Sequence, residues 1–159
     1  MNRSLSFRKA HPEEAGQLSE LALRSKAYWG YSEEFLDTCR SELTVDPARI
    51  ESDRYQYFIA AERDVIVGFY ALERVSDKEY ELEALFVEPE HIGTGIGRSL
   101  LQHAKRVLSR IGASRLIIQG DPNAKEFYVA SGGRQIGARE SASVPDRYLP
   151  LFEIEIESG

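Results

Sequence analysis

The sequence predicts an α/β or α+β fold with a mixed sheet, because strand-type and helix-type segments alternate along most of its length. Near the middle, three strand-type segments follow one another with no helix between them, which indicates neighbouring strands of one sheet. The 159 residues are enough for one domain with a sizeable core, so we expect a single domain over residues 1–159. Hydrophobic residues at 42% and charged residues at 29% are typical of a globular protein.

The first half of the chain is predicted to form a strand, two helices and a hairpin. Pro12 followed by two acids is typical of a first helical turn, and Ser32 is a suitable N-cap for the second helix. The expected elements are a strand over Leu5–Arg8, a helix opening at His11-Pro12-Glu13-Glu14, a helix from Ser32 to Leu43, and strands over Tyr55–Ala61 and Val65–Arg74 joined by a tight turn.

The second half continues with a strand of strict alternation, Glu79–Val87. We expect one of its faces to carry Tyr80, Leu82, Ala84 and Phe86 and the other to carry Glu79, Glu81, Glu83, Leu85 and Val87. The remaining elements are a helix from Ile96 that ends at Gly112, a strand over Leu116–Gln119, a helix from Asp121 to about Ser131, and strands over Arg134–Glu140 and Leu149–Ile156.

Charge and composition exclude several classes of protein. The net charge of −6 argues against a general nucleic-acid binder, and no apolar run is long enough to cross a membrane. With one cysteine, Cys39, and no apolar leader, we expect a reducing cytoplasmic location. Residues 91–120 nevertheless contain no Asp or Glu and five basic side chains. This distribution favours a discrete anionic ligand, although a solvated basic helix face would give the same pattern.

A glycine-rich turn lies between the most regular strand and the most regular helix, with Gly93, Gly95 and Gly97 at alternate positions. Such a turn lets consecutive N–H groups point at one anion, and the following helix adds its positive dipole end. The spacing fails the dinucleotide fingerprint, which needs G-x-G-x-x-G followed by an acid. It also fails the nucleotide-triphosphatase loop, because the lysine is missing. An acyl-coenzyme A pyrophosphate site is the class whose context matches.

At this turn the chain resembles the GNAT superfamily of acetyl-CoA-dependent N-acetyltransferases. The family motif Q/R-x-x-G-x-G/A corresponds to Ile92-Gly93-Thr94-Gly95-Ile96-Gly97, with Ile92 in place of Gln or Arg. A second family signature matches the segment from Asn123 to Gly132 that contains Phe127-Tyr128. The resemblance covers essentially the whole chain. It implies a mixed, mostly antiparallel central sheet of six to seven strands flanked by about four helices.

The resemblance also implies the site of acetyl-CoA, which would be a co-substrate. The end of one strand would bind the pantetheine arm, the glycine turn would hold the pyrophosphate, and Asn123 would contact the pantetheine or phosphate region. The hydroxyl of Tyr128 would lie near the thioester sulfur. The implied cofactor-binding residues are Leu85, Phe86, Val87, Ile92, Gly93, Thr94, Gly95, Ile96, Gly97, Arg98, Asn123 and Tyr128.

Acetyl transfer to an amine requires a neutral nitrogen, and a carboxylate can accept the proton. Glu81 and Glu83 lie two residues apart on the expected strand. The resemblance makes Glu81 the first candidate, because it occupies the position four before Leu85 where some family members carry their base. These acids could also lie on a solvent-exposed strand face, or attract a cationic substrate without accepting a proton. Tyr128 is expected to hydrogen-bond the departing sulfur, since a thiolate of pKa ~8.5 does not require full proton transfer from a phenol of pKa ~10.

The function expected from these residues is direct acetyl transfer to a primary amine of a small molecule or peptide, with no metal, nucleic-acid or membrane partner. A non-catalytic acyl-CoA-binding regulatory module and an enzyme for longer acyl chains are the alternatives. Tyr28, Trp29 and Tyr31 are weak candidates for the acceptor pocket. A homodimer is possible if the strand at Phe152–Ile156 lies at the edge of the sheet.

Overall fold

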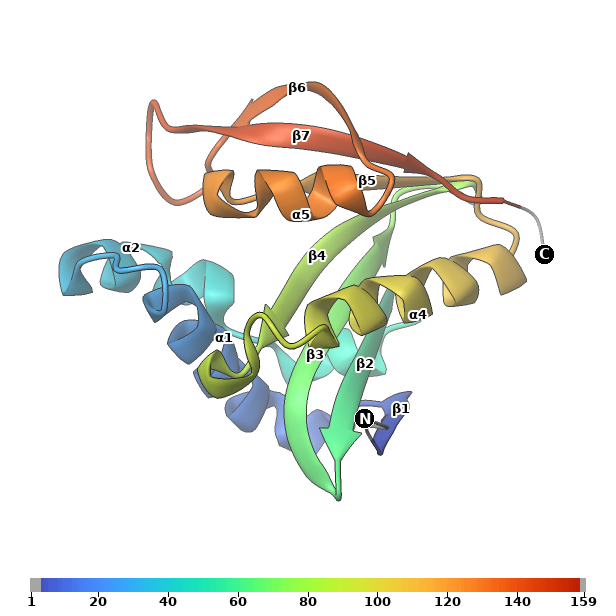
Figure 1. Cartoon of the computed structure of the whole chain (residues 1–159), viewed down its shortest axis with the longest axis horizontal. Helices are drawn as coiled ribbons and strands as arrows, with labels where there is room; N and C mark the ends of the chain where they lie inside the picture. Colours follow the sequence, from blue (N-terminus) through green and yellow to red (C-terminus); the bar gives the residue numbers. More distant parts are fainter. Residues whose placement is uncertain (1–3, 158–159) are drawn as a thin grey trace.

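A computed structural model describes residues 4–157 of the chain; residues 1–3 and 158–159 of the expected domain lie outside this range. All seven strands belong to one sheet of order β1-β2-β3-β4-β5-β7-β6, in which only β4 and β5 pair in parallel (Figure 1). The predicted mixed, mostly antiparallel sheet is therefore confirmed. The strands are β1 (Leu5–Lys9), β2 (Tyr55–Glu62), β3 (Val65–Arg74), β4 (Glu79–Val87), β5 (Arg115–Gln119), β6 (Arg134–Glu140) and β7 (Tyr148–Glu155).

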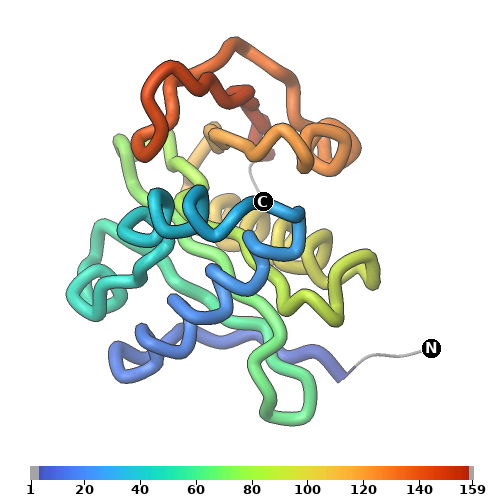
Figure 2. Tube along the Cα trace, turned by 90° about the vertical axis from the view of Figure 1, so that its left-hand side faces the viewer, coloured from blue at the N-terminus to red at the C-terminus, as the bar shows by residue number. Residues whose placement is uncertain are grey.

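Helices cover both faces of the sheet, and each face has its own apolar core. Leu18 and Leu21 of α1 pack with Ile59 and Phe69 on one face, whereas Leu100 and other residues of α4 pack on the opposite face. Figure 2 views the molecule from the side of α1 and α2, with the C-terminal strands above them. The helices are α1 (Ala15–Ala27), α2 (Glu33–Leu43), α3 (Pro47–Glu51), α4 (Ile96–Arg110) and α5 (Lys125–Ala130). In the described range, no helix has the length and apolarity needed to cross a membrane.

The helix boundaries follow from local signals in the sequence. The hydroxyl of Ser32 accepts a hydrogen bond from the N–H of Phe35, so the predicted N-cap of α2 is confirmed. The short helix α3 was not expected. Its signal was present, because Pro47 occupies the first turn and the carboxylate of Asp46 accepts a hydrogen bond from the N–H of Ala48.

The predicted faces of β4 are wrong, because a β-bulge interrupts the alternation. Ala71 of β3 pairs with Ala84, but the next residue of β3 pairs with Leu82, so Glu83 is the extra residue. As a result, Tyr80 and Leu82 belong to the core beneath α4, whereas Ala84 and Phe86 pack against the core beneath α1. The bulge thus turns the Glu83 side chain independently of its neighbours.

The premise for a dimer along the last strand is also wrong. One edge of β7 pairs with β5 and its other edge pairs with β6, so β7 lies inside the sheet. The edges are formed by β1 and β6. β7 is therefore not an edge strand of the sheet, contrary to that premise.

Gly68 allows α4 to lie close to the centre of the sheet. A Cβ at this position would lie 2.9 Å from the carbonyl oxygen of Phe86 and 3.0 Å from Cδ1 of Leu100. We expect Gly68→Ala to lower the free energy of unfolding by about 1–3 kcal/mol in urea denaturation. The same substitution at Gly16 of α1, where nothing lies within 4 Å, should instead stabilise by about 0.5–1 kcal/mol. Equal effects at both positions would contradict this explanation.

Candidate functional site

A cavity of about 510 Å³ opens where two parallel strands separate. The pairing of β4 with β5 ends at Leu82 and Ile118, while β4 continues to Val87 (Figure 1). Beyond Leu82, no described strand pairs with β4 on the side of β5. The cavity is lined on one face of the sheet by Arg49 and Tyr57 and on the other by the glycine turn and α5. An extended ligand can therefore pass through the sheet and bond to the free edge of β4.

The glycine turn forms one end of this cavity. Gly93 and Gly95 have φ angles of 83° and 93°, which glycine adopts without strain. Since α4 begins at Ile96, its first N–H groups have no partner within the helix. Gly97 lies in the first turn of α4, where a Cβ would be 3.6 Å from the ring of Phe127. The predicted turn is thus present, with open N–H groups and a helix dipole directed at the cavity.

Among the residues assigned to cofactor binding, most line the cavity, whereas Thr94 and Ile96 do not. Thr94 is absent from the lining; its hydroxyl donates a hydrogen bond to the carbonyl of His91. Ile96 is fully buried in the core beneath α4 and offers only its backbone. The assigned residues that line the cavity are Leu85, Phe86, Val87, Ile92, Gly93, Gly95, Gly97, Arg98, Asn123 and Tyr128.

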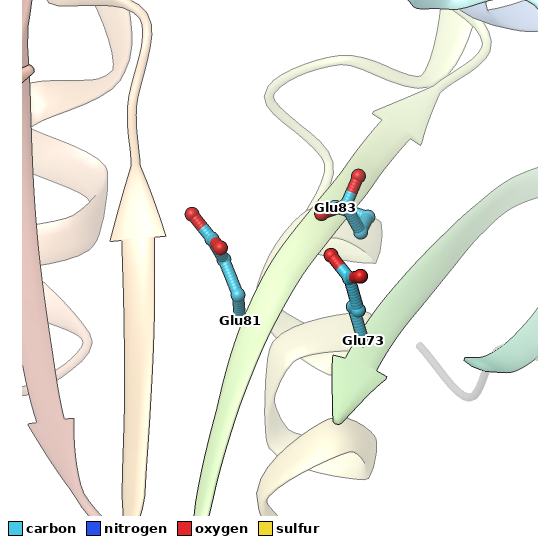
Figure 3. A group of neighbouring side chains, drawn as sticks. All are labelled: Glu73, Glu81 and Glu83. Carbon is cyan, nitrogen blue, oxygen red and sulfur yellow. The ribbon is translucent and has the colours of Figure 1, made fainter. Parts of the chain in front are cut away.

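The side chain of Glu83 lies beside that of Glu73 of β3 (Figure 3). Glu83 lines the cavity and shares a hydrogen bond with Glu73. Burial by the cavity walls, together with this hydrogen bond and the charge of Glu73, raises the pKa of Glu83 to about 7. The side chain remains accessible to solvent through the cavity, which fits a group that exchanges protons. The hydrogen bond from Glu83, and Arg54 at 2.6 Å, hold the pKa of Glu73 below its usual range.

Glu81 lies in a different environment from Glu83. It forms an ion pair with Arg139 of β6 and does not line the cavity. The carboxylate oxygens of Glu73, Glu81 and Glu83 nevertheless lie within 4.8 Å of one another, close enough to share a cation. The ion pair with Arg139 already offsets part of this negative charge. The geometry therefore favours Glu83 over Glu81 as the group that meets a ligand.

Tyr128 lies in the wall of the cavity and packs edge-on against Phe127, with ring centroids 5.2 Å apart. Burial raises the pKa of its hydroxyl well above the usual value, and the charge of Asp121 adds to this effect. The phenol therefore stays protonated at neutral pH and can act as a hydrogen-bond donor to a group in the cavity.

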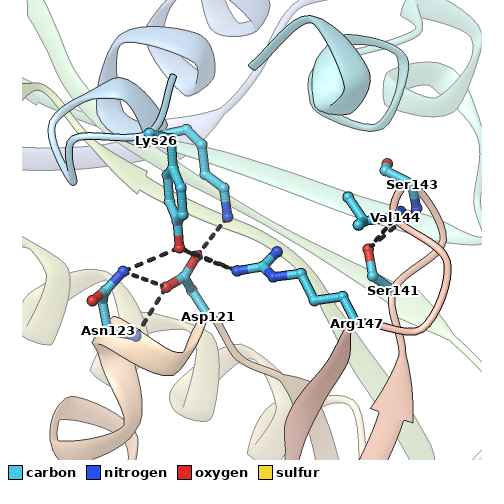
Figure 4. Close-up of polar contacts among 8 residues, drawn as sticks. Lys26, Asp121, Asn123, Ser141, Ser143, Val144 and Arg147 are labelled. Atoms are coloured by element: carbon cyan, nitrogen blue, oxygen red, sulfur yellow. Dashed lines mark hydrogen bonds and ion pairs between the residues drawn. The ribbon is translucent and has the colours of Figure 1, made fainter. Parts of the chain in front are cut away.

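A polar network forms around Asp121 (Figure 4), and its members Lys26, Asp121, Asn123 and Arg147 line the cavity. The carboxylate of Asp121 lies 2.6 Å from Nζ of Lys26 and accepts a hydrogen bond of 2.8 Å from the hydroxyl of Tyr31. Asn123 donates to the same carboxylate through its side chain, and Arg147 donates to the hydroxyl of Tyr31. Burial would raise the pKa of Asp121, but the hydrogen bond from Lys26 and its other partners outweigh it and the pKa is lowered. The network joins the end of α1 to Arg147, the residue before β7.

The three aromatic candidates for the acceptor pocket separate in the structure. Trp29 lines the cavity, whereas Tyr28 is 52% exposed and Tyr31 belongs to the Asp121 network. Sequence reasoning missed Asp121, which it identified only as a helix start, and Arg49, which lies on the unexpected helix α3. The signal available in the sequence was the Asp-Pro pair at the start of each of these two segments, Asp46-Pro47 and Asp121-Pro122.

Comparisons with known proteins agree with this architecture. The sequence profile of the family described as acetyltransferase (GNAT) domain matches residues 16–143. A search of curated protein sequences gives no significant match. Among solved structures, the PaiA N-acetyltransferase from Thermoplasma acidophilum in complex with coenzyme A is 21% identical, covers 96% of this chain and 99% of its own, and has a TM-score of 0.76.

Two further structures show the same fold. A GCN5-related N-acetyltransferase from Rhodopseudomonas palustris is 22% identical over 98% of both chains, with a TM-score of 0.78. The ribosomal-protein-S18-alanine N-acetyltransferase from Escherichia coli is 19% identical, covers 98% of this chain and 96% of its own, and has a TM-score of 0.72. At these identities the likeness concerns the fold.

Proposed function

Because this chain belongs to the acetyltransferase (GNAT) domain family, we propose that it transfers an acetyl group from acetyl-CoA to a primary amine by direct attack in a ternary complex. The observation that carries the proposal is the opening between β4 and β5, flanked by the glycine turn at one end and by Glu83 at the other. The chemical groups in this opening match the three parts of the reaction: an anionic carrier, an acyl group and a cationic amine.

Coenzyme A, the anionic carrier of the acetyl group, is the reactant for which the cavity offers the most backbone hydrogen-bonding groups. The turn from Gly93 to Arg98 supplies N–H groups and a helix dipole for the pyrophosphate. The free edge of β4 at Leu85–Val87 supplies N–H and C=O groups for the amides of pantetheine, in the manner of an added strand. The similar protein from Thermoplasma was solved with coenzyme A, which supports this choice of carrier.

Glu83 is the residue that prepares the amine in this proposal. Ionised Glu83 accepts a proton from the bound ammonium, and the freed nitrogen lone pair forms a bond to the thioester carbon. The carbon–sulfur bond breaks, and Tyr128 donates a hydrogen bond to the departing thiolate. The proton that the attacking nitrogen still carries passes to this thiolate through solvent, which gives the free thiol. A backbone N–H near Val87 is the donor we assign to the thioester oxygen. The role assigned to Glu81 on sequence grounds passes to Glu83, because Glu83 lines the cavity.

The direct test is release of free thiol from acetyl-CoA in the presence of a panel of primary amines, together with calorimetry of coenzyme A binding. We expect amine-dependent thiol release and a product whose mass increases by one acetyl group. Binding of coenzyme A without thiol release from any amine would instead support the regulatory module. No binding of coenzyme A would overturn both functions.

Tyr128→Phe tests the assignment of the leaving-group donor. Loss of one hydrogen bond to a developing charge should lower kcat by about tenfold. The affinity for coenzyme A should change little, because the ring still packs against Phe127 and Phe152. Steady-state kinetics and calorimetry measure the two effects separately. An unchanged kcat would remove Tyr128 from the reaction.

A further inference from the structure

Arg49 occupies the wall of the cavity on the same face of the sheet as Tyr57 and is held in place by two tyrosines. Its guanidinium lies over the ring of Tyr55, 5.1 Å from the centroid. The hydroxyl of Tyr57 also lies close enough to interact with the guanidinium. Both partners are neutral, so they orient the guanidinium without balancing its charge.

Arg49 differs in this respect from the other cations near the acceptor end of the cavity. Lys26 lies 2.6 Å from the carboxylate of Asp121, and Arg147 lies 3.9 Å from it. Within residues 4–157, no carboxylate lies within 4.0 Å of the Arg49 guanidinium. Glu42, the other acid of the lining besides Glu83 and Asp121, accepts a hydrogen bond from Ser143. Glu83 acts on Arg49 through space and raises its pKa, but it forms no direct ion pair with the guanidinium, whose hydrogen-bond donors can therefore bind an anionic group in the cavity.

We propose that the acceptor amine also bears a carboxylate, as in an amino acid, and that Arg49 binds this carboxylate while Glu83 receives the proton of the ammonium group. The proposal rests on the proposed function and names its substrate class. A planar guanidinium can bind a carboxylate through two parallel hydrogen bonds, which positions the substrate as well as attracting it. Opposite charges at Arg49 and Glu83 match the two ends of a zwitterion.

The experiment compares amino acids with their amides in the thiol-release assay. Each pair has the same amine and skeleton and differs in the negative charge. The amide has the less basic amine, so basicity alone favours the amide. We expect the unmodified enzyme to prefer the acid of at least one pair by about tenfold or more in kcat/KM. An aminoalkylphosphonate in the panel distinguishes a carboxylate site from a general anion site.

Arg49→Gln should reduce this acid-to-amide preference by about 10–100-fold, since it removes the charge and the paired hydrogen bonds. Arg49→Lys should retain part of the preference, because the positive charge remains but the paired hydrogen-bond donors of the planar guanidinium are lost. Comparing the ratio within a pair cancels any effect of Arg49 on the protonation of Glu83. Arg40→Gln is the matched control, because Arg40 pairs with Asp37 on the surface of α2 and should leave the ratio unchanged.

The possible outcomes distinguish failure of the proposed substrate class from failure of the proposed acetyltransferase function. Thiol release with amides and simple amines, but no preference for acids, would overturn the proposal and leave the acetyltransferase function standing. Equal loss of acid and amide turnover in Arg49→Gln would likewise overturn it, as would a stronger preference for the phosphonate. Absence of thiol release with every amine would overturn the proposed function and this proposal with it. Thermal unfolding of each variant confirms that it is folded.

Discussion

Glu83→Gln is expected to lower kcat/KM at neutral pH by about 10²–10⁴-fold, the usual contribution of a general base. The amide retains the size of the side chain and can still hydrogen-bond Glu73, but it cannot accept a proton from the ammonium group. Coenzyme A binding should be unchanged, because the glycine turn lies at the other end of the cavity. Kinetics and calorimetry on the same preparation therefore distinguish loss of the base from loss of the site.

The pH dependence gives a second, independent reading of the same residue. The pKa of Glu83 is about 7, and only its ionised form accepts a proton. For the unmodified enzyme, kcat/KM should therefore rise with pH through about 7 and level off above it. This acid limb should disappear in Glu83→Gln. A limb that persists in the variant would show that another group, or the amine itself, is being titrated.

Two neighbouring acids provide the controls. Glu73→Gln removes the hydrogen-bonded negative charge that helps to raise the pKa of Glu83, so its acid limb should move to lower pH. Glu81→Gln should have a smaller effect on kcat/KM than Glu83→Gln, because Glu81 pairs with Arg139 outside the cavity lining. If Glu81→Gln abolished turnover and Glu83→Gln did not, the base would be Glu81, as its position in the sequence first indicated.

The order of the elements could be predicted from the sequence because each one carries a local signal. The amphipathic period of α4, its stop at Gly112 and the turn between β2 and β3 depend on residues close together in the chain. The glycine turn could be predicted for the same reason. Its three glycines and the helix that follows are adjacent, and their geometry requires no information about distant residues.

The environment of Glu83 could not be predicted, because it depends on pairing between strands. Strict alternation placed Glu81 and Glu83 on one face, but the bulge opposite Ala71 is a property of two strands together. The contact with Glu73 and the pairing of Glu81 with Arg139 likewise join residues far apart in the chain. The position of β7 inside the sheet also depends on long-range order, which hydrophobic pattern alone does not fix.

Gly95→Asp is expected to weaken coenzyme A binding by about 10–100-fold, because it places a negative charge at the start of α4, where we assign the pyrophosphate. Aspartate and asparagine tolerate positive φ better than other side chains, so the strain at this φ of 93° is small and similar for both. Gly95→Asn is therefore the matched control for shape and strain. The difference between the two variants isolates the charge, and calorimetry measures it directly.

The salt dependence makes this prediction specific to electrostatics. Repulsion between the introduced carboxylate and a pyrophosphate would be screened by added salt, so the gap between Gly95→Asp and Gly95→Asn should narrow as ionic strength rises. Gly112→Asp, at the far end of α4 and with a φ of 82°, introduces the same charge without approaching the cavity. It should leave the affinity for coenzyme A unchanged. Equal weakening by Gly95→Asp and Gly112→Asp, or equal affinities of Gly95→Asp and Gly95→Asn, would mean that the pyrophosphate binds elsewhere.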